Sequence, residues 1–198
     1  MKKWTCVFLT ALLGMVFLMS GCGSQDEDDG SLKVAFISTA VDSEAAQSYA
    51  QALIERDSSI TGVDCTTISL GSSQTDPAGY MAASMQLTGL VAAGDLDAIF
   101  FDIEGAAASA RNDTFYALSE LFTEEELAKM EGKTIDYAQV DEEGNETQER
   151  TAEVGLDVSN EEELTQILRS EQVGLYIVGN APHLEQAKTL FLSYVTEG

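Results

Sequence analysis

The sequence predicts an α/β fold with three layers, α/β/α, around a mixed, mostly parallel sheet of about five or six strands, plus a β-hairpin. The first observation is an alternation of short apolar runs with amphipathic segments, which is typical of parallel strands joined by helices. The second is composition: 44% of the 198 residues are hydrophobic, which suits a single globular domain. The excess of 34 acidic over 10 basic residues therefore does not indicate disorder.

The first half of the domain reads as strand, helix, strand, helix, strand. Apolar runs rich in β-forming residues predict strands at 33–39, 64–70 and 96–102. Asp42 or Ser43 can cap a helix that ends before Thr61-Gly62. A second helix is expected over 79–93, stopped by Gly94-Asp95. This order predicts parallel strands with right-handed crossovers.

The middle of the chain is less regular. Residues 104–122 are predicted to be mostly helical, and Thr123 with Glu126 forms a candidate capping box for a short helix. Two strands are expected at 134–140 and 149–158, joined by the turn DEEGNE as a hairpin.

The carboxyl-terminal part returns to alternation. Asn160 with Glu163 is a second capping candidate, opening a helix, and a strand is expected at 173–178. A closing helix follows. The apolar positions expected to face the core on these two helices are Leu164, Ile167, Leu168, Ala187, Leu190, Phe191 and Tyr194.

The amino terminus has the pattern of a secretory signal. Lys2 and Lys3 precede an uncharged stretch that runs to Gly21, and Cys22 follows. The segment LMSGC resembles the bacterial lipoprotein signal, in which the cysteine is acylated and becomes the new amino terminus; Met19 stands where Leu is usual. An uncleaved membrane helix is the alternative. We therefore expect a signal peptide at 1–21 and an extracytoplasmic protein held in the bilayer through acylated Cys22.

The segment 22–31 is predicted to be a flexible tether, because GSQDEDDGS is polar, acidic and has nothing to bury. Its DEDD run could bind calcium, but a solvated spacer is the simpler interpretation, since ordering a loose segment is costly. One α/β domain is expected from 32 to 198.

Two passages resemble extracellular solute-binding proteins. AGDLDAIFFDIEG (93–105) is similar to a helix end and following strand in that family, and GLYIVGNAPHLEQAKTLFLSYV (174–195) to its late strand and helix. Together with the lipoprotein signal, they resemble the type 2 periplasmic-binding fold of ABC-transporter lipoproteins. That family has two lobes with the ligand between them, whereas this chain has room for one. The resemblance implies a reduced, single-lobe relative.

Ligands of open α/β sheets sit beyond the carboxyl ends of the strands. Asp102 and Glu104 at this edge would repel an anion, so a small polar or cationic solute is expected rather than a phosphate. Ordinary loop and capping chemistry is the alternative. The candidate ligand-binding residues are Ser38, Thr39, Gly71, Ser72, Ser73, Asp102 and Glu104.

No catalytic residue, metal site or cofactor is predicted. His183 is the single histidine and stands at a helix start, and neither a dinucleotide fingerprint nor a phosphate-binding loop is present. Cys65 opens an apolar strand and is expected to be an inert thiol. The acidic runs 124–126, 141–143 and 161–163 are interpreted as solvated faces; the alternative is a surface for a basic partner or divalent cations.

Three functions follow from these observations. The first is a membrane-anchored lipoprotein that binds a small solute as a single lobe or serves a transporter. The second is a module that holds another envelope protein without a small ligand. The third is a hydrolase, which has the weakest support because abundant carboxylates carry no specific signal. Nucleic acid is not expected as a partner, since a net charge of −24 repels phosphates.

Overall fold

A computed structural model describes residues 30–57 and 59–196. The predicted signal peptide, Cys22 and most of the predicted tether lie outside the described residues. No helix within the described part of the chain is long and apolar enough to cross a membrane.

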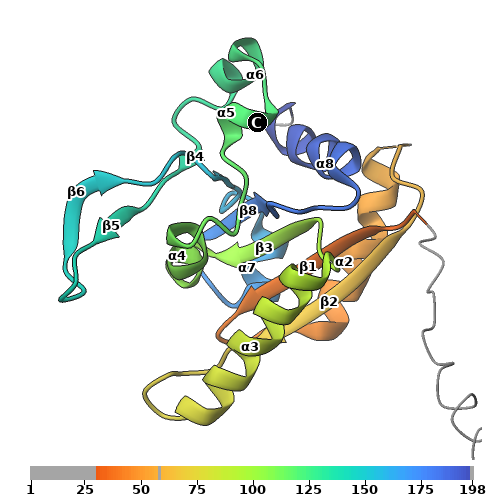
Figure 1. Ribbon diagram of the computed structural model, residues 1–198. Coiled ribbons are helices and arrows are strands. Elements are labelled where there is room, and N and C mark those ends of the chain that lie inside the picture. Colours follow the sequence, from red (N-terminus) through yellow and green to blue (C-terminus); the bar gives the residue numbers. More distant parts are fainter. Residues whose placement is uncertain (1–29, 58, 197–198) are drawn as a thin grey trace, which may run out of the picture.

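The main sheet has six strands in the order β2-β1-β3-β8-β7-β4 (Figure 1). Both β2 and β3 pair with β1 in parallel, and the three remaining pairings are antiparallel. The predicted mixed sheet is confirmed, with parallel pairing confined to its first half. The strands are β1 (Leu32–Ser38), β2 (Val63–Ser69), β3 (Ala98–Asp102), β4 (Thr134–Ile135), β7 (Gly155–Asp157) and β8 (Val173–Ile177).

The predicted three layers follow from alternation along the strands. In β1, Leu32, Val34 and Phe36 face one apolar cluster, whereas Ala35 and Ile37 face another. The first cluster is covered by α2 (Ser43–Arg56), α7 (Glu162–Leu168) and α8 (Leu184–Thr196), and the second by α3 (Pro77–Ala93) and α4 (Ile103–Arg111). The helices therefore cover both faces of the sheet.

Helix α2 begins where the sequence indicates. The Asp42 side chain accepts a hydrogen bond from the backbone N–H of Ala45, which satisfies a donor that the first helical turn leaves unpaired. Helix α3 is capped in the same way by Asp76, and it ends at Gly94, whose φ of +71° is the left-handed conformation that glycine adopts at low cost.

The expected helix over 104–122 is interrupted. Helix α4 ends at Arg111 and α5 spans only Leu118–Leu121. Between them the chain turns at Asn112 and Asp113, and Phe115 then forms an isolated β-bridge to Val178. Its ring stacks on Tyr176 with centroids 4.5 Å apart. Packing against the end of β8 therefore overrides the helical pattern.

Each of the two expected hairpin strands is divided into two. Their inner parts, β4 and β7, belong to the main sheet, whereas the outer parts, β5 (Ala138–Val140) and β6 (Glu146–Arg150), pair only with each other. Figure 1 shows β5 and β6 as an arm that stands out from the domain. The hairpin is confirmed, and it extends farther than the predicted strands because β6 begins at Glu146.

Two capping candidates have different outcomes. The capping box of Thr123 and Glu126 is present at the start of α6 (Glu124–Lys129). The prediction for Asn160 is wrong: α7 follows Glu161 as N-cap and has no side-chain cap hydrogen bond. The apolar faces predicted for α7 and α8 are buried as expected.

Tyr176 needs two glycines as neighbours. A Cβ atom at either Gly155 or Gly174 would overlap the Tyr176 side chain, which is fully buried. The Tyr176 hydroxyl pairs with that of Tyr137 at 2.5 Å, and Tyr137 also donates to the carbonyl of Ile103 at 2.9 Å. These contacts tie the hairpin base to the start of α4 and to β8.

Candidate functional site

The predicted ligand rim assembles at one edge of the sheet. The parallel register places Ser38 beside Ser69 of β2, one position beyond the pair formed by Ile37 and Phe101. Thr39 then accepts a hydrogen bond from the Gly71 backbone N–H at 3.0 Å. The ends of three neighbouring strands therefore meet, as expected.

The two least exposed polar side chains of this rim are engaged within the fold. The Ser38 hydroxyl is buried and donates to the carbonyl of Leu168 at the end of α7. Asp102 accepts a hydrogen bond from Gly105 N–H at 2.7 Å as the N-cap of α4, and another from the hydroxyl of Ser170. Both side chains therefore hold helices against the sheet edge.

The other rim residues are exposed: Thr39 and residues 71–73 lie in loops, and Glu104 lies in the first turn of α4. The Ser72 hydroxyl accepts hydrogen bonds at 3.3 Å from the backbone N–H groups of Gln74 and Thr75, so it stabilises the turn before α3. The structure brings the predicted rim residues to one edge of the sheet, and the binding of a solute there stays a prediction.

A different surface stands out on α3. This helix carries no charged side chain over its 17 residues, in a chain of net charge −24. Only Leu87 is buried, with Ala83, Leu90 and Val91 packed partly against the sheet. A helix without any charged side chain normally has neighbours on most sides, but within the described part of the chain α3 packs on one side only.

Large apolar side chains are exposed on the outer side of α3. Met81 is 63% exposed and Met85 is 68% exposed, which makes them the most exposed large hydrophobic side chains in the described part of the chain. We define the outer face of α3 as the helical stripe centred on Met85, and all its members are exposed. They are Ala78, Met81, Ala82, Met85, Thr88, Gly89 and Ala92.

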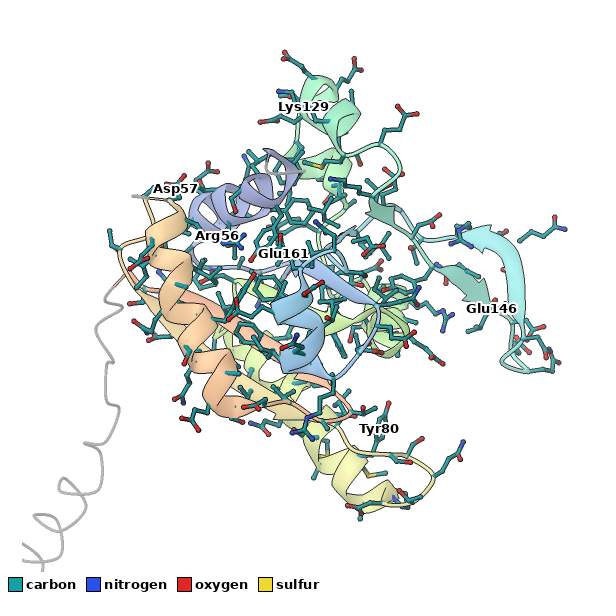
Figure 2. The ribbon with its side chains drawn as sticks, turned by 180° about the vertical axis from the view of Figure 1, so that it is seen from behind. Arg56, Asp57, Tyr80, Lys129, Glu146 and Glu161 are labelled. Carbon is teal, nitrogen blue, oxygen red and sulfur yellow. The ribbon has the colours of Figure 1, made fainter. Side chains whose placement is uncertain are left out.

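A groove of about 490 Å³ separates α3 from α4. Its lining combines apolar side chains with hydroxyl and amide groups. Tyr80, which Figure 2 labels near the start of α3, borders the groove. The residues that line the groove include Leu70, Tyr80, Ser84, Phe101, Ser109 and Asn112.

Sequence reasoning missed this surface, although a signal was present. The run from Pro77 to Gly94 has no Asp, Glu, Lys or Arg, and it is flanked by Asp76 and Asp95. Periodicity alone assigns one face of such a helix to the core, but it does not show that the opposite face is equally apolar and unpartnered.

Asp97 and His183 are in contact inside the fold. The carboxylate of Asp97 is fully buried and accepts hydrogen bonds from the backbone N–H of Lys33 at 2.8 Å and of His183 at 2.6 Å. It also bonds His183 Nδ1 at 2.9 Å. Burial raises the pKa of the half-buried Cys65 thiol to about 11, so the thiol is protonated at neutral pH.

Residues 30–57 and 59–196 hold no group of three or more His, Cys, Asp or Glu side chains placed to bind a metal ion. Comparisons with protein-family models, curated proteins and solved structures find no match to this chain. Two features of the molecule bear on its function: a sheet edge whose central polar groups are hydrogen-bonded within the fold, and an uncharged, exposed helix face.

Proposed function

We propose that this protein is an extracytoplasmic lipoprotein, held at a bacterial membrane through acylated Cys22, whose α/β domain is a protein-interaction module. The anchor rests on the amino-terminal pattern, with Lys2 and Lys3, an uncharged core and the LMSGC segment. The contact surface that we assign to the module is the outer face of α3.

The interaction module is inferred from the exposure of Met81 and Met85 on a helix without charged side chains. Large exposed apolar patches on globular proteins mark interaction sites, whereas single scattered apolar side chains are ordinary. Methionine suits such a surface because its flexible, polarisable side chain adapts to a partner. Interfaces are also depleted of charged residues at their centres.

The position of the face agrees with this function. Gly30, where the described chain begins, precedes β1 at the amino edge of the parallel strands, whereas α3 begins at the carboxyl edge (Figure 1). A tether that enters through Gly30 therefore joins the sheet at the edge away from the start of α3.

The contact surface is tested by photo-crosslinking in native membranes, with a photoreactive amino acid at Met85 of the full chain. The matched control carries the same group at Gln51, which is exposed on α2 on the other side of the sheet. We expect a discrete adduct from position 85 and none from position 51. No adduct from position 85, or equal adducts from both, would contradict the proposal.

The anchor is tested separately, by metabolic labelling with a fatty-acid analogue. The full chain should take up the label, and the Cys22→Ala variant should not. Label retained by the variant would overturn the assignment of Cys22.

A second function, capture of a small solute, is favoured by the α3–α4 groove. Its volume of about 490 Å³ lies within the range of small-molecule sites, and its lining combines apolar side chains with polar groups. A thermal-shift screen with amino acids, sugars and polyamines tests it: a ligand at 100 times its Kd stabilises by about 2.7 kcal/mol. The shift should disappear in a Ser84→Trp variant, which fills the groove.

A further inference from the structure

We propose that the occupant of the outer face of α3 is a second copy of this chain, paired antiparallel about a two-fold axis through Met85. This inference rests on the proposed function, and it identifies the partner of the interaction module as a second copy of the chain. An isologous pair uses the same surface patch on both copies, so the patch must be complementary to itself. The outer face of α3 meets this condition.

The complementarity appears when α3 is laid against its own copy. Met85 is the midpoint of the helix Pro77–Ala93. In an antiparallel pair centred there, Met81 faces Gly89 of the other copy, and Met85 faces its equivalent. The long side chain of Met81 therefore lies over a residue that has no side chain, as in the packing of ridges into grooves. The flanking residues Ala78 and Ala92, which face each other, are small enough for close approach.

The polar side chain on this face already has a hydrogen-bond partner within the helix. Thr88 carries the only hydroxyl of the stripe, and this hydroxyl donates to the Ser84 carbonyl at 2.9 Å within the helix. No other member of the stripe has a polar side chain. Burial against a second copy would therefore leave no side-chain donor without a partner.

Charge explains why this face is suited to a second copy. Two copies of a chain of net charge −24 repel each other, and like charges placed in contact across an interface are costly. Helix α3 presents 17 residues without charge, so along its length the two copies can touch with no carboxylate opposite a carboxylate. Asp76 of each copy and Asp95 of the other approach each other only beyond the helix ends. An antiparallel arrangement also sets the positive end of each helix dipole beside the negative end of its neighbour.

One helix face is a small interface, below the area of a stable soluble dimer. The membrane anchor compensates for the small contact area, because two copies confined to one membrane meet at a much higher effective concentration than in solution. The pairing is therefore expected on the membrane, and to weaken when the protein is extracted and diluted.

The test is disulfide crosslinking of the full chain in native membranes. A disulfide needs Cα atoms about 4.4–6.8 Å apart. In the proposed register Met85→Cys meets its equivalent and should give a covalent dimer. Met81→Cys alone should not, because the two copies of this position are eight residues apart along the helices, about 12 Å. Co-expression of Met81→Cys with Gly89→Cys should restore the dimer.

The controls use the same chain. Gln51→Cys, exposed on α2, should give no dimer, and the parent chain reports the background from its own cysteines. A dimer from Met81→Cys alone, or none from Met85→Cys, would overturn the register and the pairing.

The photo-crosslink at Met85 separates this inference from the proposed function. An adduct with a different protein in place of a second copy would overturn self-pairing and leave the interaction module standing. No adduct of any kind would overturn both.

Discussion

The buried carboxylate of Asp97 accepts hydrogen bonds from two nitrogen atoms of His183, a residue 86 positions later in the chain. The same carboxylate accepts the backbone N–H of Lys33 at the start of β1. One side chain therefore joins the amino ends of β1 and β3 to the segment that leads into α8. Its role is to hold these segments of the fold together.

Replacing Asp97 should be strongly destabilising. Asp97→Ala leaves three nitrogen donors without their acceptor in a buried site, and we expect a loss of about 3–5 kcal/mol in the free energy of unfolding. The matched control is Asp95→Ala, because Asp95 is half-exposed and makes only a 3.4 Å ion pair with Lys33. It should cost less than about 1 kcal/mol. Urea unfolding measures both, and equal losses would contradict the assigned role.

The glycines beside Tyr176 give a second prediction. Gly174→Ala inserts a methyl group into the space of the Tyr176 hydroxyl and should cost about 1–3 kcal/mol through overpacking. Gly89→Ala, in the interior of α3 with no atom near the added methyl group, should stabilise by about 0.5–1 kcal/mol. If Gly174→Ala unfolds at the same urea concentration as the parent chain, the close packing around Tyr176 is wrong.

The predicted rim offers a test of structural against binding roles. Asp102→Ala removes the cap of α4 and the hydrogen bond from Ser170, so a loss of about 1–2 kcal/mol in stability is expected. Glu104→Ala removes an exposed carboxylate and should change stability by less than about 0.5 kcal/mol. A solute whose affinity depends on Glu104, measured by calorimetry, would show that the rim binds a ligand.

Buried tyrosine pairs predict a loss of stability at high pH. Burial raises the pKa of Tyr49 and of Tyr137 to about 12, and it raises the pKa of Tyr176 and of Tyr194 well above 10. The unfolded chain releases these protons near pH 10, before the folded protein does. Stability is therefore full below about pH 10 and falls as the pH rises toward 12.

The measurement is the free energy of unfolding in urea at pH 7, 9, 10 and 11. A Tyr49→Phe, Tyr194→Phe double variant removes both hydroxyls of the pair that bond at 2.7 Å, so neither is left without a partner. Its stability should fall less steeply above pH 10 than that of the parent chain. Identical slopes would contradict the account.

Arg56 contributes to the same region from outside the pair. Its guanidinium lies 4.5 Å from the ring centroid of Tyr194 and 3.3 Å from a Glu161 carboxylate oxygen. Figure 2 shows Arg56 and Glu161 close together between α2 and α7. The cation–π contact and the ion pair together explain why an arginine is suited to this site.

Much of the fold could be predicted because local signals agreed with tertiary packing. The first three strands, α2 with its Asp42 cap and the buried faces of α7 and α8 follow directly from periodicity and capping. The break between α4 and α5 could not be foreseen, since it depends on Phe115 reaching Tyr176, a residue 61 positions away. Long-range packing of this kind leaves no local trace.

The candidate site shows the same division. The predicted strand order placed Ser38 and Asp102 at one edge of the sheet. It did not indicate that Ser38 would hydrogen-bond to Leu168, or that Asp102 would accept a hydrogen bond from Ser170. For α3 the helix was foreseen and its unpartnered side was not, because an apolar residue has the same signature whether it faces a core or a partner.

The most direct test of the central claim, that the outer face of α3 is a contact surface, is oxidation of methionine by dilute peroxide. It is followed by mass spectrometry on the full chain in native membranes and after extraction and dilution. Met130 is fully buried and should stay protected in both states. We predict that Met81 and Met85 react several-fold more slowly in membranes than after dilution. Equal rates in the two states would contradict the account.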